Sequence, residues 1–387
     1  MENNRSRFYC PELDCLRFVA FLSVLVYHLE QQFHSVVKLD SPGEWMFLCI
    51  VKSGIFGVDL FFCLSSFLIT ILLLREHDLR GTIDIRAFWI RRMLRIWPLY
   101  YFFLLLSATI LPYWLQQQQL WGWRLLHYWF FLGNYDVITH DWHHSPVGPL
   151  WSISVEEQFY LVWPLLLLVN PKRLLPLAVA ALVGANVYRL LHHPASFTGQ
   201  WANTLYHVDP IAWGAIAAYF AHAGRLNLSI LLRSVLLLTG IFVIPAYFFC
   251  RGFVPFFDGK DLMLYPISSC CCVLVVVSLY NLKVVPWGSL FMRFWAYLGH
   301  ISYGLYVFHM LALTVIVLQF YAHGFYHGEV IATFSKLKFA AFAAILSLTI
   351  LLAWASYTFL ESPFLKLKKK YTYIPSAPET AGKEVKQ

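Results

Sequence analysis

Two ionisable residues, Arg17 and His28, share the first apolar segment of the chain. They are eleven positions apart, and on an α-helix this is roughly 1100°, or about three turns plus 20°, so both side chains would lie on one face. Their separation along the helix axis is roughly 16 Å, which puts one near a membrane surface and the other deep in the bilayer. An intramembrane charge usually has a functional reason. For a lone histidine, a hydrogen-bonded core position is the more frequent alternative.

A second basic motif, WIRRMLRIWPLYY, begins another apolar segment. Its Arg92 and Arg95 are three positions apart and lie on one helical face at the inner membrane boundary. Guanidinium groups bind phosphate oxygens in a bidentate manner, so this pair suits a phosphorylated ligand that arrives from the cytoplasm. The alternative is the general excess of Lys and Arg at cytoplasmic membrane boundaries, which requires no ligand.

Carboxylates and a further histidine lie in other apolar segments. Glu156 and Glu157 follow Trp151 in LWSISVEEQFYLVWP, and His309 ends the stretch ISYGLYVFH. With His28 they predict a carboxylate–imidazole site deeper in the membrane than the arginines. This layout suits a donor that enters from the cytoplasm and an acceptor that meets it further in. Supporting roles are expected for Trp151 and for five polar residues: Asp14, Asp59, Ser65, Ser154 and Glu361.

The composition indicates what kind of structure must hold these groups. Of 387 residues, 59% are hydrophobic and 13% are charged, and the mean hydropathy is +0.60. An average soluble domain is about 25% charged. These values exclude an ordinary soluble enzyme, a disordered chain and a DNA-binding domain, and they predict an all-α polytopic membrane protein.

Apolar runs of about 20 residues predict ten transmembrane helices. The approximate ranges are 13–32, 55–74, 95–115, 151–169, 174–191, 209–222, 229–249, 262–281, 295–318 and 339–360. With a cytoplasmic N-terminus, 20 Lys and Arg fall on the inner side and 6 on the outer side, so we expect both termini to be cytoplasmic. We find no internal repeat, which leaves an inverted-repeat transporter without support.

The chain divides into a membrane domain at 1–365 and a short basic cytoplasmic tail at 366–387. The tail lysines are expected to be orientation anchors rather than a lipid-binding site: Lys366, Lys368, Lys369 and Lys370. No cleaved signal peptide is expected, because no small-residue cleavage site follows the first apolar run.

No metal site is expected either. The eight cysteines lie mostly in apolar stretches without ligand spacing, so they are predicted to be small hydrophobic residues rather than disulfide or zinc ligands. One outer loop superficially resembles a metal cluster, but a polar loop is the favoured interpretation; its residues are His140, Asp141, His143 and His144.

Six stretches of the chain resemble the motifs of the acyltransferase-3 family of integral membrane acyltransferases. In family order they are ELDCLRFVAFLSVLVYH, GVDLFFCLSSFLI, RRMLRIWPLYY, LWSISVEEQFYLVWP, ISYGLYVFH and FLESPF. They run from about residue 12 to 364 and so cover nearly the whole chain. Two positions depart from the family pattern, because Cys15 and Ser66 stand where glycine is usual. Neither change removes a chemical group, and a small residue such as Ser66 still allows close helix packing.

The resemblance implies transfer of an acyl group, usually acetyl, from acyl-CoA to a hydroxyl of a sugar. The acceptor expected here is a lipopolysaccharide, O-antigen or other surface glycan precursor, and the expected location is the bacterial cytoplasmic (inner) membrane. Acetyl-CoA is the expected donor. Many family members carry a fused SGNH-type hydrolase domain, whereas only about 22 residues follow the last motif here, so we expect a stand-alone enzyme.

The resemblance also implies roles for the ionisable residues. Arg92 and Arg95, with Arg17, would bind the phosphates of CoA. His28 would be the general base, since imidazole has an ordinary pKa of about 6.5. Glu156 or Glu157 would orient His28 or the sugar. His309 would stabilise a developing oxyanion. An acyl-enzyme on Ser65 or His28 stays open.

Three other interpretations stay open at this point. A transporter or flippase of a lipid-linked sugar would use the same intramembrane groups as a proton or substrate path. A catalytically silent relative would lack the activity, although all the ionisable motif residues are present. A macrolide or other secondary metabolite could replace the glycan as acceptor. Binding and slow hydrolysis of acyl-CoA would distinguish an enzyme from a flippase.

Overall fold

The computed structural model describes residues 8–33, 41–115, 120, 122–142, 146–169, 173–192, 194, 196–282, 290–322 and 327–374, with the backbone alone at 33, 169, 319–322 and 327–338. The regular structure of these residues is helical, without a β-strand. Outward faces are apolar: Leu190 and Leu231 are 68% and 74% exposed. Such faces are stable against lipid rather than water. The prediction of an all-α membrane protein is thus confirmed.

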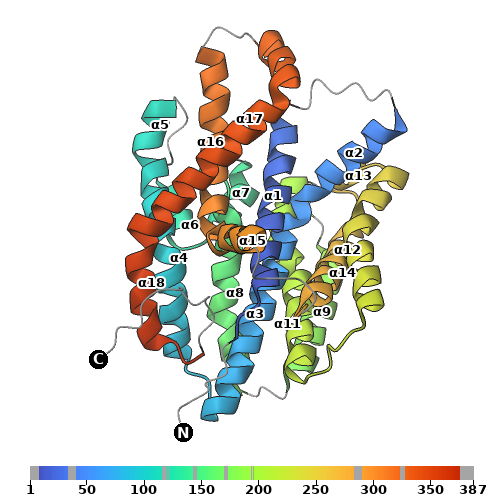
Figure 1. Ribbon diagram of the computed structural model, residues 1–387, viewed down its shortest axis with the longest axis vertical. Helices are drawn as coiled ribbons and strands as arrows, with labels where there is room; N and C mark the ends of the chain where they lie inside the picture. Colours follow the sequence, from blue (N-terminus) through green and yellow to red (C-terminus); the bar gives the residue numbers. More distant parts are fainter. Residues whose placement is uncertain are drawn as a thin grey trace.

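Within the described residues, each predicted span falls on a helix, and Figure 1 shows these helices gathered into one bundle. The helices that match a predicted span are α1 (Pro11–Phe33), α3 (Gly57–Arg80), α4 (Ile85–Ala108), α8 (Leu150–Val169), α9 (Leu174–Leu191), α11 (Val208–His222), α12 (Ile230–Arg251), α14 (Leu264–Leu279), α16 (Ser302–Ala322) and α17 (His327–Ala355). The shorter helices are α2 (Pro42–Ser53), α5 (Ile110–Leu115), α6 (Trp123–Trp129), α7 (Gly133–His140), α10 (Phe197–Trp201), α13 (Val254–Phe257), α15 (Leu290–His300) and α18 (Ser362–Lys368).

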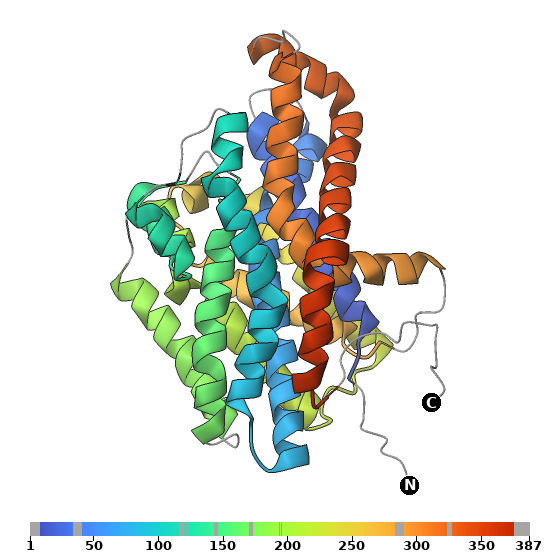
Figure 2. The same cartoon turned by 90° about the vertical axis from the view of Figure 1, so that its left-hand side faces the viewer.

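Two of the predicted spans are broken. The range 95–115 divides at Thr109, where α4 ends and α5 follows. The range 295–318 contains a bend of 72° between α15 and α16. Figure 2 shows α15 lying across the bundle while α16 runs along it. The bend brings His300, at the end of α15, against α4, where Arg95 Nη2 donates a 3.0 Å hydrogen bond to the His300 carbonyl.

Not every helix is long enough to cross a bilayer alone. By length and apolar composition, the described residues contain four such stretches, 42–80, 174–191, 230–251 and 339–371, and α15 with α16 would make a fifth. Helices α11 and α14 have 15 and 16 residues, whereas a full crossing takes about 20. The helices are therefore present, and the number of membrane crossings stays a prediction.

Close helix contacts fix the position of the polar residues. Gly299 of α15 lies against α1, where a Cβ would be 1.7 Å from the Asp14 carbonyl oxygen. Gly214 of α11 lies against α3, where a Cβ would be 2.3 Å from the Cys63 carbonyl oxygen. Ser66 is fully buried at this second contact and donates a 2.6 Å hydrogen bond to the Ile211 carbonyl. The small residue at Ser66 thus allows α3 to pack closely against α11.

The two ends of the described chain meet at one end of the bundle. Figure 2 shows the first turns of α1 and the last turns of α18 at the same, lower end. An even number of crossings requires this arrangement. Which end faces the cytoplasm stays a prediction.

Candidate active site

A cleft opens between α1, α3, α4, α8 and α16, with about 1400 Å³ of empty space including its mouth. Its wall combines apolar and aromatic residues with basic, acidic and hydroxyl side chains. The polar residues in its wall are Tyr9, Asp14, Arg17, Ser65, Arg92, Arg95, Ser152, Glu156, Tyr160, His300, Ser302, Tyr303, Tyr306 and Lys368. Many of the chemical groups singled out in the sequence therefore meet in one place.

The three predicted arginines line this cleft together. Arg17 forms a 2.7 Å ion pair with Asp14, one turn earlier on α1. Arg95 donates to a backbone carbonyl at its edge. The Arg92 guanidinium lies 5.6 Å from the centre of the Tyr160 ring, and its Nε is buried without a hydrogen-bond partner among the described residues. Three cations with a single paired carboxylate leave positive charge facing the cleft.

The two adjacent glutamates of α8 have different surroundings. Glu156 lines the cleft, and its Oε1 accepts hydrogen bonds from the Ser65 and Tyr160 hydroxyls. Glu157 does not line it; its Oε2 accepts a 3.0 Å hydrogen bond from Trp97 Nε1, and its Oε1 is buried without a partner among the described residues. Successive helical residues point about 100° apart, so only one of the pair can face the cleft.

The two histidines come together, as the sequence analysis expected. The His28 and His309 ring centres are 5.4 Å apart. His309 is fully buried, and its Nδ1 lies 2.5 Å from the Tyr306 carbonyl oxygen. Its Nε2 has no hydrogen-bond partner among the described residues. An unpaired buried nitrogen is unfavourable unless a further group binds it, which fits a site residue.

The histidine pair does not line the cleft. Tyr306 lies between the histidine pair and the cleft. It lines the cleft, and its ring centre is 5.4 Å from that of His309. Its hydroxyl lies 2.7 Å from Ser152 Oγ, and Phe61 packs against its ring at 5.7 Å. Tyr306 and Phe61 therefore form an aromatic barrier between the arginines of the cleft and the histidine pair.

The tyrosines were missed by the sequence analysis. Tyr306 precedes His309 by three positions in the motif ISYGLYVFH, so both lie on one helical face. Tyr160 follows Glu156 by four positions and meets it for the same reason. The spacing contained this signal, but aromatic residues are frequent throughout the chain.

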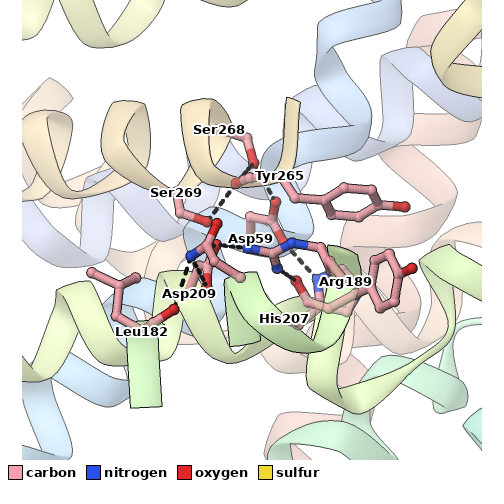
Figure 3. Close-up of polar contacts among 10 residues, drawn as sticks. Asp59, Leu182, Arg189, His207, Asp209, Tyr265, Ser268 and Ser269 are labelled. Carbon is pink, nitrogen blue, oxygen red and sulfur yellow. Dashed lines mark hydrogen bonds and ion pairs between the residues drawn. The ribbon is translucent and has the colours of Figure 1, made fainter. Parts of the chain in front are cut away.

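Asp59 belongs to a separate buried network, drawn in Figure 3. Its Oδ1 lies 2.7 Å from His207 Nδ1, and its Oδ2 accepts a 2.9 Å hydrogen bond from Ser268. Beside them, Arg189 forms a buried ion pair with Asp209. Phe62 lines the cleft, and its ring contacts that of His207 at 5.2 Å, so it separates the network from the cleft. Asp59 thus joins α3 to the helices around it and does not face the cleft.

The remaining supporting residues also lie outside the cleft wall. Trp151 is buried with its ring 5.6 Å from that of His207. Ser154 donates to the Leu150 carbonyl at 3.0 Å and accepts from the Gly133 amide at 3.2 Å, which fixes α8 against α7. Glu361 is buried and accepts a 3.2 Å hydrogen bond from Ser356. Of the supporting residues, Asp14 and Ser65 line the cleft.

The loop that resembles a metal cluster has other contacts. His140 Nδ1 lies 3.1 Å from Asp136 Oδ1, and Asp141 accepts a 2.8 Å hydrogen bond from Thr198. His143 and His144 lie outside the described residues. Among the residues that are described, three or more His, Cys, Asp or Glu side chains nowhere gather in an arrangement that could hold a metal ion.

Comparison with curated proteins finds similar chains among bacterial O-acetyltransferases. The chain is 27% identical over 393 residues to the peptidoglycan O-acetyltransferase OatA of Listeria monocytogenes, covering 93% of this chain and 56% of that protein. It is 26% identical over 404 residues to the O-acetyltransferase OatA of Staphylococcus aureus, covering 97% and 60%. The chain thus spans a little over half the length of these relatives. No solved structure is significantly similar.

A family comparison agrees with the six motifs and with the fold. Residues 11–358 match the family model described as an acyltransferase domain, from the start of α1 into the last turns before α18. The match includes both histidines and the three arginines of the cleft. The chain therefore belongs to the acyltransferase-3 family of integral membrane acyltransferases.

Proposed function

We propose that this protein transfers an acetyl group from acetyl-CoA to a hydroxyl of a cell-surface glycan at the bacterial cytoplasmic membrane. One observation carries the proposal: Arg17, Arg92 and Arg95 line the same cleft as the Ser65–Glu156 contact. Family membership and the O-acetyltransferase relatives support the reaction class.

The donor would enter at the basic end of the cleft. Its phosphates would contact the guanidinium groups of Arg92 and Arg95, which form strong charge-assisted hydrogen bonds with phosphate oxygens. The slender pantetheine arm would extend along the cleft past Ser65 toward Tyr306. This places the thioester beside the aromatic barrier, with the histidine pair on its other side.

Transfer would require the Tyr306 ring to move aside, after which the acceptor hydroxyl would attack the thioester carbonyl carbon. His28 would accept the hydroxyl proton as general base, which typically contributes 10²–10⁴-fold in rate. The carbon–sulfur bond then breaks, and the CoA thiolate leaves and takes up a proton. His309, 5.4 Å from His28 between ring centres, would orient the His28 imidazole by accepting a hydrogen bond at its unpaired Nε2, because its Nδ1 faces the Tyr306 carbonyl and so carries the ring proton.

Two classes of glycan are candidates for the acceptor. A matched relative is named a peptidoglycan O-acetyltransferase, which favours a peptidoglycan sugar. The other candidate is the lipopolysaccharide or O-antigen precursor that the motif resemblance implies. The barrier at Tyr306 suggests that the acceptor approaches the histidines from the side opposite the donor.

Mass spectrometry of glycans from cells with and without the protein tests the proposal. We expect one additional acetyl group on a defined sugar, and purified protein that binds acetyl-CoA and slowly hydrolyses it. In the His28→Ala variant, transfer should be lost while acetyl-CoA binding persists. A wild-type protein that neither binds nor hydrolyses acetyl-CoA, but moves a lipid-linked sugar across vesicles, would support the flippase instead.

A further inference from the structure

The last described residues fold back onto the mouth of the cleft. After α17 the helix continues through a turn of π-helix, Ser356–Glu361, into α18 and a short 3₁₀ turn, Lys369–Tyr371. This segment then runs along the start of α4 as far as Ile374. We call residues 362–374 the C-terminal segment.

Several contacts hold the C-terminal segment in place. Arg91 Nη1 donates a 2.7 Å hydrogen bond to the Tyr371 carbonyl. The Tyr373 hydroxyl donates to Asp84 at 2.7 Å, and the Arg80 guanidinium lies 3.9 Å from the centre of the Tyr373 ring. Ile374 is buried in the same apolar cluster as Phe8 and Leu13. These contacts join the segment to both walls of the cleft mouth.

The four lysines of this segment are not equivalent. Lys366, Lys369 and Lys370 are exposed, whereas Lys368 is half-buried and lines the cleft with the three arginines. It also lines a smaller adjoining cavity with Arg92 and Tyr373. The expectation that all four are orientation anchors does not fit Lys368, whose side chain faces the donor end of the cleft.

The cleft mouth has more positive charge than its own carboxylates balance. Asp14 pairs with Arg17, but among the described residues no carboxylate lies within 4 Å of the charged nitrogens of Arg92, Arg95 or Lys368. Glu156 is bonded to hydroxyl groups instead. Clustered, partly desolvated cations are unfavourable without a counter-charge. An anion of high charge density, such as a polyphosphate, would supply it.

We propose that Lys368 is a donor-binding residue that contacts a phosphate of the nucleotide end of acyl-CoA, together with Arg17, Arg92 and Arg95. The inference rests on the proposed function and deepens it, because it makes the C-terminal segment a part of the site. CoA carries a diphosphate and a separate 3′-phosphate. Two forked guanidiniums suit the diphosphate, and a lysine on a flexible stem suits a single phosphate group as a point charge.

Binding measurements on the full chain in detergent test this assignment. Lys368→Gln should weaken acetyl-CoA binding by about tenfold or more, as expected for a hydrogen bond between charged groups. Its kcat should stay near the wild-type value, so the weaker binding should appear as a higher KM for acetyl-CoA. Lys370→Gln removes an exposed lysine from the same segment and should change neither value. Lys368→Arg should restore most of the affinity.

Dephospho-CoA thioester, which lacks the 3′-phosphate, distinguishes the phosphate groups. If Lys368 contacts the 3′-phosphate, the wild type should bind this analogue as weakly as the Lys368→Gln variant binds acetyl-CoA. A readout without mutation is protection from an amine-reactive reagent: acetyl-CoA should shield Lys368 and leave Lys370 reactive. Matching melting temperatures of the two glutamine variants would show that both are folded.

Three results bear on the inference in different ways. Equal acetyl-CoA affinity in Lys368→Gln and Lys370→Gln, without protection of Lys368, overturns it and leaves the proposed function intact. Absence of acetyl-CoA binding in the wild type overturns the proposed function itself. Loss of binding to vesicles of anionic phospholipid in Lys368→Gln, with acetyl-CoA affinity unchanged, assigns Lys368 to a lipid headgroup and overturns the inference.

Discussion

At the scale of single residues, the chemistry of the cleft depends on which atoms face it. Glu156 meets the Ser65 and Tyr160 hydroxyls in the cleft wall, whereas Glu157 bonds Trp97 Nε1 between α4 and α8. Two carboxylates of the same type therefore have separate tasks. One lines the cleft, and the other joins two helices.

Substitution of each glutamate by glutamine separates these tasks. Glu156→Gln should lower kcat by about 100-fold or more, the usual contribution of a positioned acid–base group. Glu157→Gln keeps a hydrogen-bond acceptor for Trp97, so its kcat should change by much less. Steady-state acetyl transfer, with acetyl-CoA binding as the folding control, measures both. Equal losses in the two variants would contradict the division.

Tyr306 decides whether the arginines and His28 share one compartment. Its ring touches the His309 ring on one side and lines the cleft on the other. Tyr306→Ala should open the barrier, so diethyl pyrocarbonate should modify His28 faster than in the wild type. Peptide mass spectrometry over a time course measures this rate. Tyr306→Phe keeps the ring and removes only the bond to Ser152, so it should leave the rate nearly unchanged.

At the scale of helices, the start of α4 joins two parts of the site. Asp84 is the N-cap residue of α4 and accepts a 2.9 Å hydrogen bond from the Ala87 amide. It also accepts from Tyr373 of the C-terminal segment. The bonds from Ala87 and Tyr373 hold the pKa of the Asp84 carboxyl below its ordinary value. One side chain thus begins the helix that carries Arg92 and Arg95 and fixes the segment that carries Lys368.

Removal of this carboxylate should loosen the segment. Asp84→Ala should lower the free energy of unfolding by about 0.5–2 kcal/mol, the usual value for a lost N-cap. Limited proteolysis with trypsin should then cut after the exposed Lys369 and Lys370 faster than in the wild type. An unchanged cleavage rate would show that the remaining contacts hold the segment without Asp84.

The lowered pKa of Asp84 also predicts a pH dependence with a definite sign. Its ionised form is the one that the folded protein favours, so its stabilising effect is complete above the unfolded pKa of about 3.9. The effect is lost as the pH falls through the lower, folded value. Asp84→Asn keeps the cap and removes the charge, so its melting temperature should lie below the wild type at pH 7 and approach it as the pH falls below about 3.9. Thermal unfolding in detergent tests this.

At the scale of the whole molecule, a buried polar network holds α3, α9, α11 and α14 together on the far side of the cleft wall. Asp59, His207, Arg189 and Asp209 are each at most 2% exposed. Figure 3 shows Asp59 of α3 and Arg189 of α9 meeting His207 and Asp209 at the start of α11. In a membrane protein, polar contacts of this kind hold helices together where apolar burial gives little preference.

Breaking this network should affect folding rather than chemistry. Asp209→Ala leaves Arg189 charged and unpaired in the interior, and loss of one partner of a buried pair costs about 3–5 kcal/mol. Expression and melting temperature should therefore fall sharply, and the protein that remains folded should bind acetyl-CoA with unchanged affinity. Weaker binding at wild-type melting temperature would place the network in the donor site instead.

The sequence alone determined the class of the protein, the positions of its helices and the family. These follow from composition, from apolar runs and from motif spacing, all of which are local along the chain. The placement of Arg17, Arg92 and Arg95 at one cleft, and the approach of His28 to His309, could also be predicted, because each residue belongs to a motif of the same family.

Only the tertiary structure decided which of the adjacent glutamates faces the cleft, that Tyr306 closes it, and that Lys368 enters it. Asp59 pairs with His207, which is 148 positions away. Helical periodicity says which residues share a face, but the rotation of each helix toward its neighbours is set by contacts such as Gly299 against α1 and Gly214 against α3. Those contacts join residues that are distant in sequence, so no local pattern contains them.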